Sequence, residues 1–417
     1  MQATPTFQRP KRPWQANMLN WAGRVLPLNK LSNFDLNEQT LIRQAEQITG
    51  LSDWGGDDFR EPLRYFLQAL ESDAGLNLVG RRFFQQDTLR LLTNRLKLED
   101  EFKKHPEILD VPVEKPLFVV GMFRSGTTFL HNMLAQDPNC RWLHLAEALL
   151  PTPAPEKDHW LTDLRLVTAS TLINRQNALS PNFAVAHHIS ANKPAECSRL
   201  FEHSMVGHLF DFRANVSSYS HWVQQQDITY AYEYYRKQLQ YLSWKWPSSH
   251  WVFKAPAHIY HLDLLLKVFP DASVVYIHRD PVKVLPSCCS VSGLARIRFS
   301  DEMVNANEVG DYWLNVLSRA VHHAMDVRKD FDSKRILDVH YMEFMQNPPE
   351  MIANIYRHFN YDFTDAMKER LHAWMNENPQ HKLGVHRYTL EQFGLSIDRI
   401  EDAFGRYYEH SGVVKER

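Results

Sequence analysis

The segment that most limits how this chain can fold is residues 121–128, which read GMFRSGTT. A short apolar run, LFVVG at 117–121, precedes this segment, and a helical pattern follows it as far as Asp137-Pro138. Apolar runs of this length favour a strand, and proline stops a helix that precedes it. The sequence therefore predicts a strand, a glycine-containing loop and a helix in direct succession.

The glycines of this loop have the spacing of a P-loop. Such a loop turns several backbone N–H groups toward one point, and the N-terminus of the following helix adds partial positive charge there. The loop is therefore predicted to bind a phosphate-type anion. A plain glycine turn with an exposed Arg124 is the alternative.

One position of the loop departs from the P-loop pattern. A nucleoside triphosphatase has lysine after the second glycine, whereas this chain has Thr127, and the positive charge sits earlier, at Arg124. The loop is therefore poorly suited to γ-phosphate transfer. It suits a ligand with one phosphate that carries a small anionic group.

The rest of the chain alternates between strand and helix patterns. Strands are predicted at 251–254, 273–278 and 335–340, and helices are predicted at 227–246, up to Phe269-Pro270, from Pro281 onward, and at 311–330. This alternation predicts an α/β fold, a P-loop-like parallel sheet flanked by helices. Residues 1–113 are predicted to be a helical N-terminal extension, for which 76–98 give the clearest pattern, and residues 114–417 the main domain.

Composition excludes several classes of protein. The formal net charge of −2 over 417 residues gives no global signal for nucleic acid or an anionic membrane. No apolar run approaches the roughly 18 residues of a membrane span, and the N-terminus lacks the apolar segment of a secretory signal. The four cysteines form no C-x-x-C pair and are predicted to be reduced thiols. A cytoplasmic location is therefore predicted, and no metal-ligand set is evident.

A second candidate anion site follows the predicted strand at 273–278. Arg279 stands at the end of that strand, where ligand sites of α/β proteins collect, and Pro281 opens the next helix. Ser287 lies about two turns along that helix. A guanidinium and a hydroxyl together can grip a phosphate through charge-assisted hydrogen bonds. The alternative is a structural pair between Arg279 and Asp280.

These two segments together resemble the PAPS-dependent sulfotransferases. GMFRSGTTFLHNML at 121–134 resembles the family's 5'-phosphosulfate loop, and VVYIHRDPVKVLPSCCSV at 274–291 resembles its 3'-phosphate motif. The resemblance extends from Pro116 to the C-terminus and suggests a soluble member of bacterial type. It implies that a sulfuryl group passes from PAPS (3'-phosphoadenosine 5'-phosphosulfate) to a hydroxyl or amine of a small, partly apolar acceptor, with release of PAP and without a metal.

The resemblance also implies roles for individual residues. Lys254 matches the family's lysine near the transferring group, where Arg124 would assist, and Phe129 and Tyr341 match aromatic residues near the adenine. The residues implied to bind the nucleotide are Arg124, Ser125, Gly126, Thr127, Thr128, Phe129, Arg279, Ser287, Tyr341, His386, Arg387 and Tyr388. The last three belong to a segment that resembles a C-terminal closure over the nucleotide in bacterial enzymes.

The resemblance does not by itself identify the general base. Cytosolic members of the family have a histidine two residues after the strand-end lysine, where this chain has Pro256. Tyrosyl-protein members use a glutamate after the first helix, and Glu147 lies near that place, offset by a few residues. Glu147 is therefore the first candidate. The other candidates are His187, His188 and Glu196, followed by His258 and His261.

Two other functions remain open from the sequence. A P-loop kinase or nucleoside triphosphatase would use Asp280 as a metal ligand and would lose activity in EDTA, unlike a sulfotransferase. A non-catalytic nucleotide-binding protein would explain the unusual Pro256. The acceptor is also open, because the aromatic residues at 200–250 suit either a pocket for a phenol, sterol or lipid alcohol or the core. The oligomeric state is open too, with a homodimer as one candidate.

Overall fold

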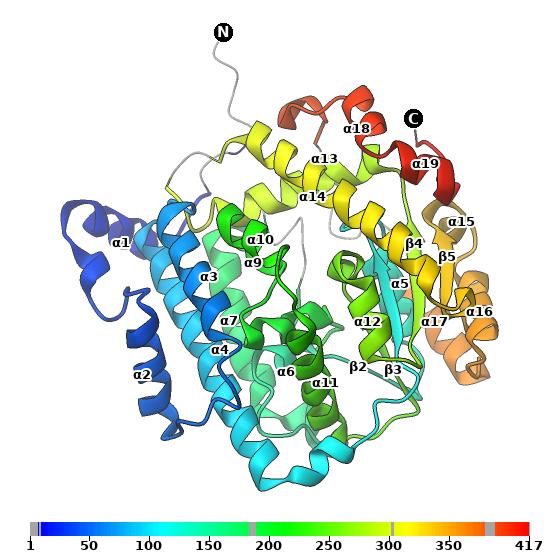
Figure 1. The fold of residues 1–417 in the computed structure, drawn as a ribbon, viewed down its shortest axis with the longest axis horizontal. Helices are drawn as coiled ribbons and strands as arrows, with labels where there is room; N and C mark the ends of the chain where they lie inside the picture. Colours follow the sequence, from blue (N-terminus) through cyan, green and yellow to red (C-terminus); the bar gives the residue numbers. More distant parts are fainter. Residues whose placement is uncertain are drawn as a thin grey trace.

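The protein contains one parallel β-sheet, seen in a computed structural model that describes residues 7, 10–181, 183, 189–301, 304–379 and 388–416. The strands run in the order β2-β3-β1-β4-β5 (Figure 1). Their bounds are β1 (Leu117–Gly121), β2 (Cys140–Trp142), β3 (His250–Lys254), β4 (Ser273–His278) and β5 (Ile336–His340). All neighbouring strands pair in parallel. The predicted α/β fold is therefore confirmed.

The strand order places β1 at the centre, with β3 and β4 on either side. The chain thus leaves the carboxyl end of β1 toward one side of the sheet and later returns on the other side. Gly121 pairs with Ile277 and His278 pairs with His340, so the carboxyl ends of β1, β4 and β5 lie close together. Ligands of open α/β sheets bind at such a switch point.

Both faces of the sheet are covered, as the apolar strands predicted. Alternate residues point to opposite faces, so Phe118 belongs to one hydrophobic cluster and Val119 to the other. The smaller cluster includes residues of α5 (Thr127–Leu134), α16 (Pro348–Phe359) and α17 (Asp365–Glu377). On the other face lie η5 (Pro256–Tyr260), α11 (Thr229–Trp244), α12 (Leu262–Val268), α13 (Pro281–Arg296) and α14 (Ala306–Val327).

The N-terminal region is helical, as predicted, and lies beside the sheet on the left of Figure 1. Its helices are α1 (Trp14–Val25), α2 (Glu38–Thr49), α3 (Arg60–Ser72) and α4 (Leu78–Lys104), with the 3-10 helices η1 (Leu28–Lys30) and η2 (Pro106–Asp110). Phe66 of α3 and Leu96 of α4 belong to the same hydrophobic cluster as Phe118 of β1. The N-terminal helices thus share a core with the sheet.

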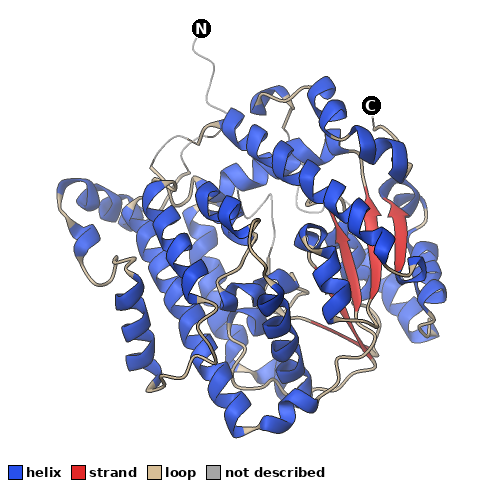
Figure 2. Cartoon of the chain, in the orientation of Figure 1, coloured by secondary structure: helices blue, strands red, loops and turns tan. Residues whose placement is uncertain are grey.

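Helices also fill most of the space between these parts (Figure 2). Between β2 and β3 come α6 (Leu145–Leu149), η3 (Lys157–Thr162), α7 (Leu164–Leu179), η4 (Cys197–Ser204), α9 (Leu209–Arg213) and α10 (Ser217–Val223). The remaining elements are η6 (Arg328–Asp330), η7 (Ser333–Arg335), α15 (Tyr341–Gln346), η8 (Glu391–Phe393), α18 (Ile397–Ala403) and α19 (Gly405–Ser411).

Two features differ most from the sequence prediction. The helix predicted from residue 311 begins at Ala306, because the Asn305 side chain accepts hydrogen bonds from the amides of Asn307 and Glu308 and so caps it. Strand β2 was not predicted, since three residues are too few to show a periodic pattern.

Two further observations concern the described part of the chain. The four cysteines are free thiols, as predicted. Within the described ranges, no helix has the length and apolar character needed to cross a membrane.

Candidate active site

The loop between β1 and α5 has the backbone geometry of an anion cradle. Gly121, Arg124 and Gly126 all have positive φ angles, 141°, 69° and 102°. A Cβ atom on Gly126 would lie 2.7 Å from the Tyr341 ring, so the loop needs glycine there for space as well as conformation. Gly126 caps α5, where the first N–H groups of a helix have no intrahelical acceptor and attract anions.

Ser125 shapes this loop from within. Its side chain is buried, and its hydroxyl donates to the Met122 carbonyl at 2.7 Å, as does its amide at 3.2 Å. Thr128 and Arg124, by contrast, are exposed. The loop thus presents the start of α5 and the Arg124 side chain outward, while Ser125 holds the turn in shape.

The structure brings the two predicted anion sites together. Arg279, directly after β4, donates to the Arg124 carbonyl at 3.4 Å, and its guanidinium lies 3.9 Å from the centre of the Tyr341 ring. Arg124 Nε in turn donates to Ser287 Oγ at 3.1 Å. The loop, Arg279 and Ser287 therefore lie at one edge of the sheet, as a nucleotide with two phosphate groups would require.

A carboxylate from the C-terminus contacts the second of these sites. Glu416 pairs with Arg279 Nε and Nη2 at 3.0 and 3.2 Å. The Glu416 amide donates to Asp280, which also accepts hydrogen bonds from Tyr408 and the Val282 amide. Asp280 therefore caps α13 and anchors the C-terminus, which leaves it poorly placed to act as a metal ligand.

A cavity of about 620 Å³ opens over the carboxyl ends of the strands. Its lining joins the loop at 121–128, Arg279 and Tyr341 to side chains from distant elements. On the side of β5, Phe129 approaches Phe344 and Trp374, with ring centres 5.4 and 5.7 Å apart. On the side of η4 and α13, the lining residues are Phe123, Glu196, Arg199, Leu209, Phe212, Arg213, Pro256, Val291, Ala295 and Arg298.

Lys254 ends β3 beside this cavity. Its side chain is buried, and Nζ lies 2.5 Å from Glu196 Oε1, which lines the cavity. Burial, with a smaller contribution from Lys254, lowers the pKa of His131 to about 3, so this neighbour stays neutral. Lys254 and Glu196 thus form an ion pair beside the cavity, whose lining also includes the loop at 121–128.

Glu147 lies outside the cavity lining. It is completely buried, Oε1 accepts from Arg141 at 2.7 Å, and Oε2 accepts from the His144 amide at 2.9 Å. The Arg141 guanidinium and then His144 outweigh the effect of burial and lower the pKa of Glu147 to about 2. This placement argues against the prediction that Glu147 is the general base, since both its oxygens hold α6 in place.

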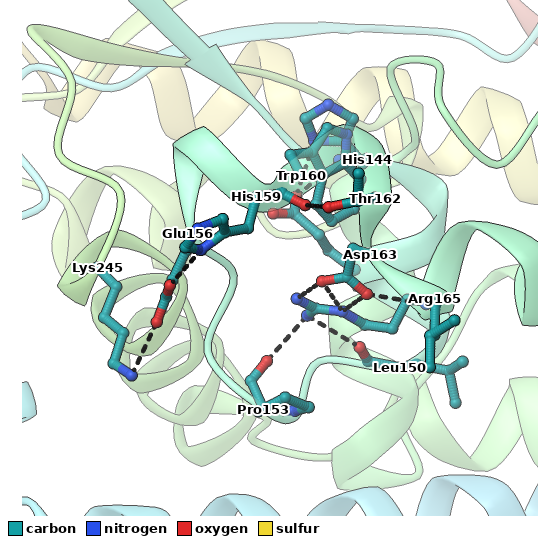
Figure 3. Close-up of polar contacts among 12 residues, drawn as sticks. His144, Leu150, Pro153, Glu156, His159, Trp160, Thr162, Asp163, Arg165 and Lys245 are labelled. Carbon is teal, nitrogen blue, oxygen red and sulfur yellow. Dashed lines mark hydrogen bonds and ion pairs between the residues drawn. The ribbon is translucent and has the colours of Figure 1, made fainter.

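The segment after α6 supports this structural reading (Figure 3). Arg165 Nη1 donates to the Pro153 carbonyl at 2.9 Å and to the Leu150 carbonyl at 3.4 Å, while its Nε donates to Asp163. The His144 ring lies 4.2 Å from the Trp160 ring. These contacts fix the turn between α6 and α7, and Glu147 belongs to the same structural network through its bonds to Arg141 and His144.

The other candidates for the base fall into three groups. Glu196 lines the cavity. His258 and His261 lie away from the cavity, and burial lowers their pKa values to about 3 and about 4. His187 and His188 lie outside the described residues, as do His386 and Arg387 of the predicted closing segment. Tyr388 is described and packs against the main core.

Sequence reasoning missed the cationic part of the lining. Arg199, Arg213 and Arg298 come from η4, α9 and the turn after α13, so no local pattern links them. Of the aromatic residues at 200–250, which suit either a pocket or the core, Phe212 lines the cavity, whereas Phe210 and Tyr219 belong to the core. Within the described residues, no group of three or more His, Cys, Asp or Glu is arranged to hold a metal ion.

Comparison with known proteins identifies the family of this enzyme. A profile described as the sulfotransferase family matches residues 116–365. The chain therefore belongs to the sulfotransferase family, and the fold and the paired anion sites agree with that class.

Particular relatives narrow the comparison. The crystal structure of the sulfotransferase STF9 from Mycobacterium avium is 28% identical, with a TM-score of 0.82, and covers 91% of this chain and 97% of its own. The crystal structure of the sulfotransferase STF1 from Mycobacterium tuberculosis is 29% identical, with a TM-score of 0.79. That match covers 88% of this chain and 98% of STF1. The omega-hydroxy-beta-dihydromenaquinone-9 sulfotransferase Stf3 of Mycobacterium bovis is 21% identical over 304 residues, 71% of this chain and 76% of Stf3.

Proposed function

We propose that this sulfotransferase takes its sulfuryl group from PAPS and transfers it to a hydroxyl or amine of a small, partly apolar acceptor. One observation carries the donor assignment: Arg279 lies 3.4 Å from the Arg124 carbonyl, so both predicted anion sites face one cavity. The 5'-phosphosulfate would bind residues 124–128, and the 3'-phosphate would bind Arg279 and Ser287. ATP has no phosphate at the 3' position and would leave the second site empty.

The adenine would lie on the β5 side of the cavity. Phe129 and Tyr341 both line it there, and Trp374 lies beside Phe129. Aromatic rings offer stacking surfaces to a purine. The aromatic character of this wall, next to Arg279, therefore supports the predicted roles of Phe129 and Tyr341.

The transfer step needs a nucleophile, an in-line leaving group and charge stabilisation. The acceptor oxygen attacks sulfur as its bond to the 5'-phosphate oxygen breaks, and the electron pair of that bond stays on the phosphate oxygen of PAP. Lys254, Arg124 and the loop amides would stabilise the charge that develops there. The acceptor proton passes to a general base.

We assign the base role to Glu196 in place of Glu147. Glu196 lines the cavity and contacts the lysine that the family resemblance places near the transferring group. When the donor binds, its sulfate would attract Lys254 and release the Glu196 carboxylate toward the acceptor. Residues 1–113 would serve as a structural extension of a sulfotransferase domain at 114–417, because their helices pack into its core.

The donor assignment is tested first by thermal shift with PAP, AMP and ATP. PAP should raise the melting temperature far more than AMP, since only PAP fills both anion sites. Equal shifts for all three nucleotides would contradict the assignment.

An acceptor screen with labelled PAPS then tests the reaction itself. Activity should persist in EDTA, because no step depends on a divalent cation. Mg-dependent hydrolysis of ATP, abolished by EDTA, would instead support a kinase or nucleoside triphosphatase.

A further inference from the structure

The cavity continues along α13 beyond the phosphate loop and reaches a buried arginine. Ser287 contacts Arg124 near the loop, whereas Val291 and Ala295 line the cavity further along the same helix and Arg298 lines it just after the helix ends. At ~1.5 Å rise per residue, the helix from Ser287 to its last residue spans roughly 13 Å, and Arg298 lies two residues beyond. Arg298 is therefore well separated from the sites proposed for the donor's phosphates.

Arg298 has little to compensate its charge. It is 2% exposed, its Nε donates to the Ala295 carbonyl at 3.2 Å, and its guanidinium stacks on Phe183 at 3.9 Å and near Phe299 at 5.0 Å. In the described part of the chain, it forms no ion pair with a carboxylate. Stacking on a ring uses the face of the guanidinium, so the outer N–H donors in its plane remain available.

Among the described residues, the carboxylates Asp87 and Glu202 pair with other arginines of this region. Arg213 pairs with Asp87 at 2.7 Å and with Glu202 at 2.8 Å, while Arg199 reaches Glu202 only at 3.5 Å. Burial, with Arg213 and Arg199, lowers the pKa of Arg298 to about 9, which still leaves it mostly charged at neutral pH. Within the described ranges, the arginines Arg90, Arg199, Arg213 and Arg298 outnumber the carboxylates Asp87 and Glu202 in this cluster. Positive charge is thus in excess.

A buried cation without a counter-ion is destabilising, because it loses hydration without gaining a partner. Here the cation borders a cavity to which Phe212, Val291 and Leu209 contribute apolar surface. An anionic ligand group would compensate this charge, and a planar guanidinium binds carboxylates and phosphates through paired hydrogen bonds.

We propose that Arg298 binds an anionic group, a carboxylate or a phosphate monoester, at the end of the acceptor remote from the hydroxyl that receives the sulfuryl group. The inference rests on the proposed function in that it takes this cavity as the acceptor site. It defines the acceptor as an apolar hydroxylated compound with an acidic terminus, and it makes Arg298 a determinant of specificity.

The first test uses the unmodified protein. Calorimetry would compare an ω-hydroxy fatty acid, its methyl ester and the ω-hydroxyalkyl phosphate of the same length, each with and without PAP. The acid, the phosphate or both should bind at least about tenfold more tightly than the ester. The compound that binds more tightly of the two identifies the acidic group. Equal binding of all three compounds, or no binding of any, would overturn the proposal.

Matched variants then locate the effect. Arg298→Gln should remove the preference for the acidic compounds, and Arg298→Lys should retain part of it. Arg296→Gln is the control, because Arg296, the last residue of α13, is also buried but lines a different pocket. A preference that survives in Arg298→Gln would overturn the proposal.

The outcomes separate this inference from the donor assignment. If PAP fails to bind, the donor assignment fails, while the comparison of acid and ester without PAP still tests Arg298. If Arg298→Gln does not fold, the unmodified protein and Arg298→Lys give the answer.

Discussion

The Glu416 carboxylate forms an ion pair with the guanidinium of Arg279, with oxygen–nitrogen distances of 3.0 and 3.2 Å. Arg279 is the residue proposed to bind the 3'-phosphate, so Glu416 stands where that phosphate would approach. A ligand must displace this carboxylate before it can pair with Arg279.

Replacing Glu416 should therefore strengthen nucleotide binding. A partly exposed ion pair contributes about 1 kcal/mol or less, so Glu416→Gln should raise PAP affinity up to about fivefold, as measured by calorimetry. AMP, which lacks the 3'-phosphate, should bind as before. Glu409→Gln, an exposed glutamate on α19, is the control and should change neither affinity. Weaker PAP binding in Glu416→Gln would show that the tail supports the site.

Removing Arg279 itself should abolish the discrimination between PAP and AMP. Loss of a charge-assisted contact to phosphate costs about 1.5–3 kcal/mol, so PAP affinity in Arg279→Ala should fall roughly 10- to 100-fold while AMP affinity changes little. Arg279→Lys should fall in between, since it keeps the charge without the planar fork. An equal loss for both nucleotides would indicate damage to the fold.

Lys254→Ala should lose turnover far more than nucleotide affinity. A group that stabilises charge only in the transition state contributes to kcat, and removal of one such donor typically costs about 10²–10³-fold. Steady-state kinetics together with PAP titration separates the two effects. An unchanged kcat would remove Lys254 from the mechanism.

Glu196→Gln and Glu147→Gln should have opposite consequences. Loss of a general base lowers kcat by about 10²–10⁴-fold, which we expect for Glu196→Gln with near-normal stability. Glu147→Gln removes the partner of the buried Arg141, which typically costs about 3–5 kcal/mol of unfolding free energy. Melting temperatures and kcat of both variants decide between the two bases; a stable, inactive Glu147→Gln protein would restore Glu147.

Stability should fall as the pH drops below about 6.5, because several histidines are buried in the neutral form. Burial lowers the pKa of His203 to about 3, whereas the unfolded chain titrates near its ordinary value of about 6.5. Between these values the unfolded state binds the additional proton, so each such histidine lowers the unfolding free energy by about 1.4 kcal/mol per pH unit. Urea unfolding at several pH values should show that the unfolding free energy of His203→Gln falls less steeply with decreasing pH than that of the unmodified protein. An identical dependence on pH would contradict the prediction.

Much of the fold followed from local patterns in the chain. The apolar run at 273–278 became β4 without a change of boundary, and the pattern at 227–246 became α11 within two residues at each end. Such patterns are readable because a buried parallel strand is continuously apolar and a surface helix is apolar on one side. The short edge strand β2 shows neither pattern and went unnoticed.

The residues of the candidate site likewise fall into those that a local pattern reveals and those that it does not. Arg279 and the loop at 121–128 were recognisable because each carries its chemistry within a few consecutive residues. Glu147 shows the opposite case, since its position in the sequence favours a general base, whereas its buried partner Arg141 lies six residues away on another element and no local pattern reveals the pair.

The amino-acid sequence by itself determined the two candidate anion-binding motifs, their order and the strands that carry them, because glycine conformation and apolar periodicity act over short stretches of chain. Only the tertiary structure decided which acid meets Lys254, which carboxylate covers Arg279, and that no carboxylate of the described residues pairs with Arg298. Glu196 and Lys254 are 58 positions apart, and Arg279 and Glu416 are 137 apart. Whether such distant charges pair depends on how the helices pack over the sheet, which no local pattern encodes.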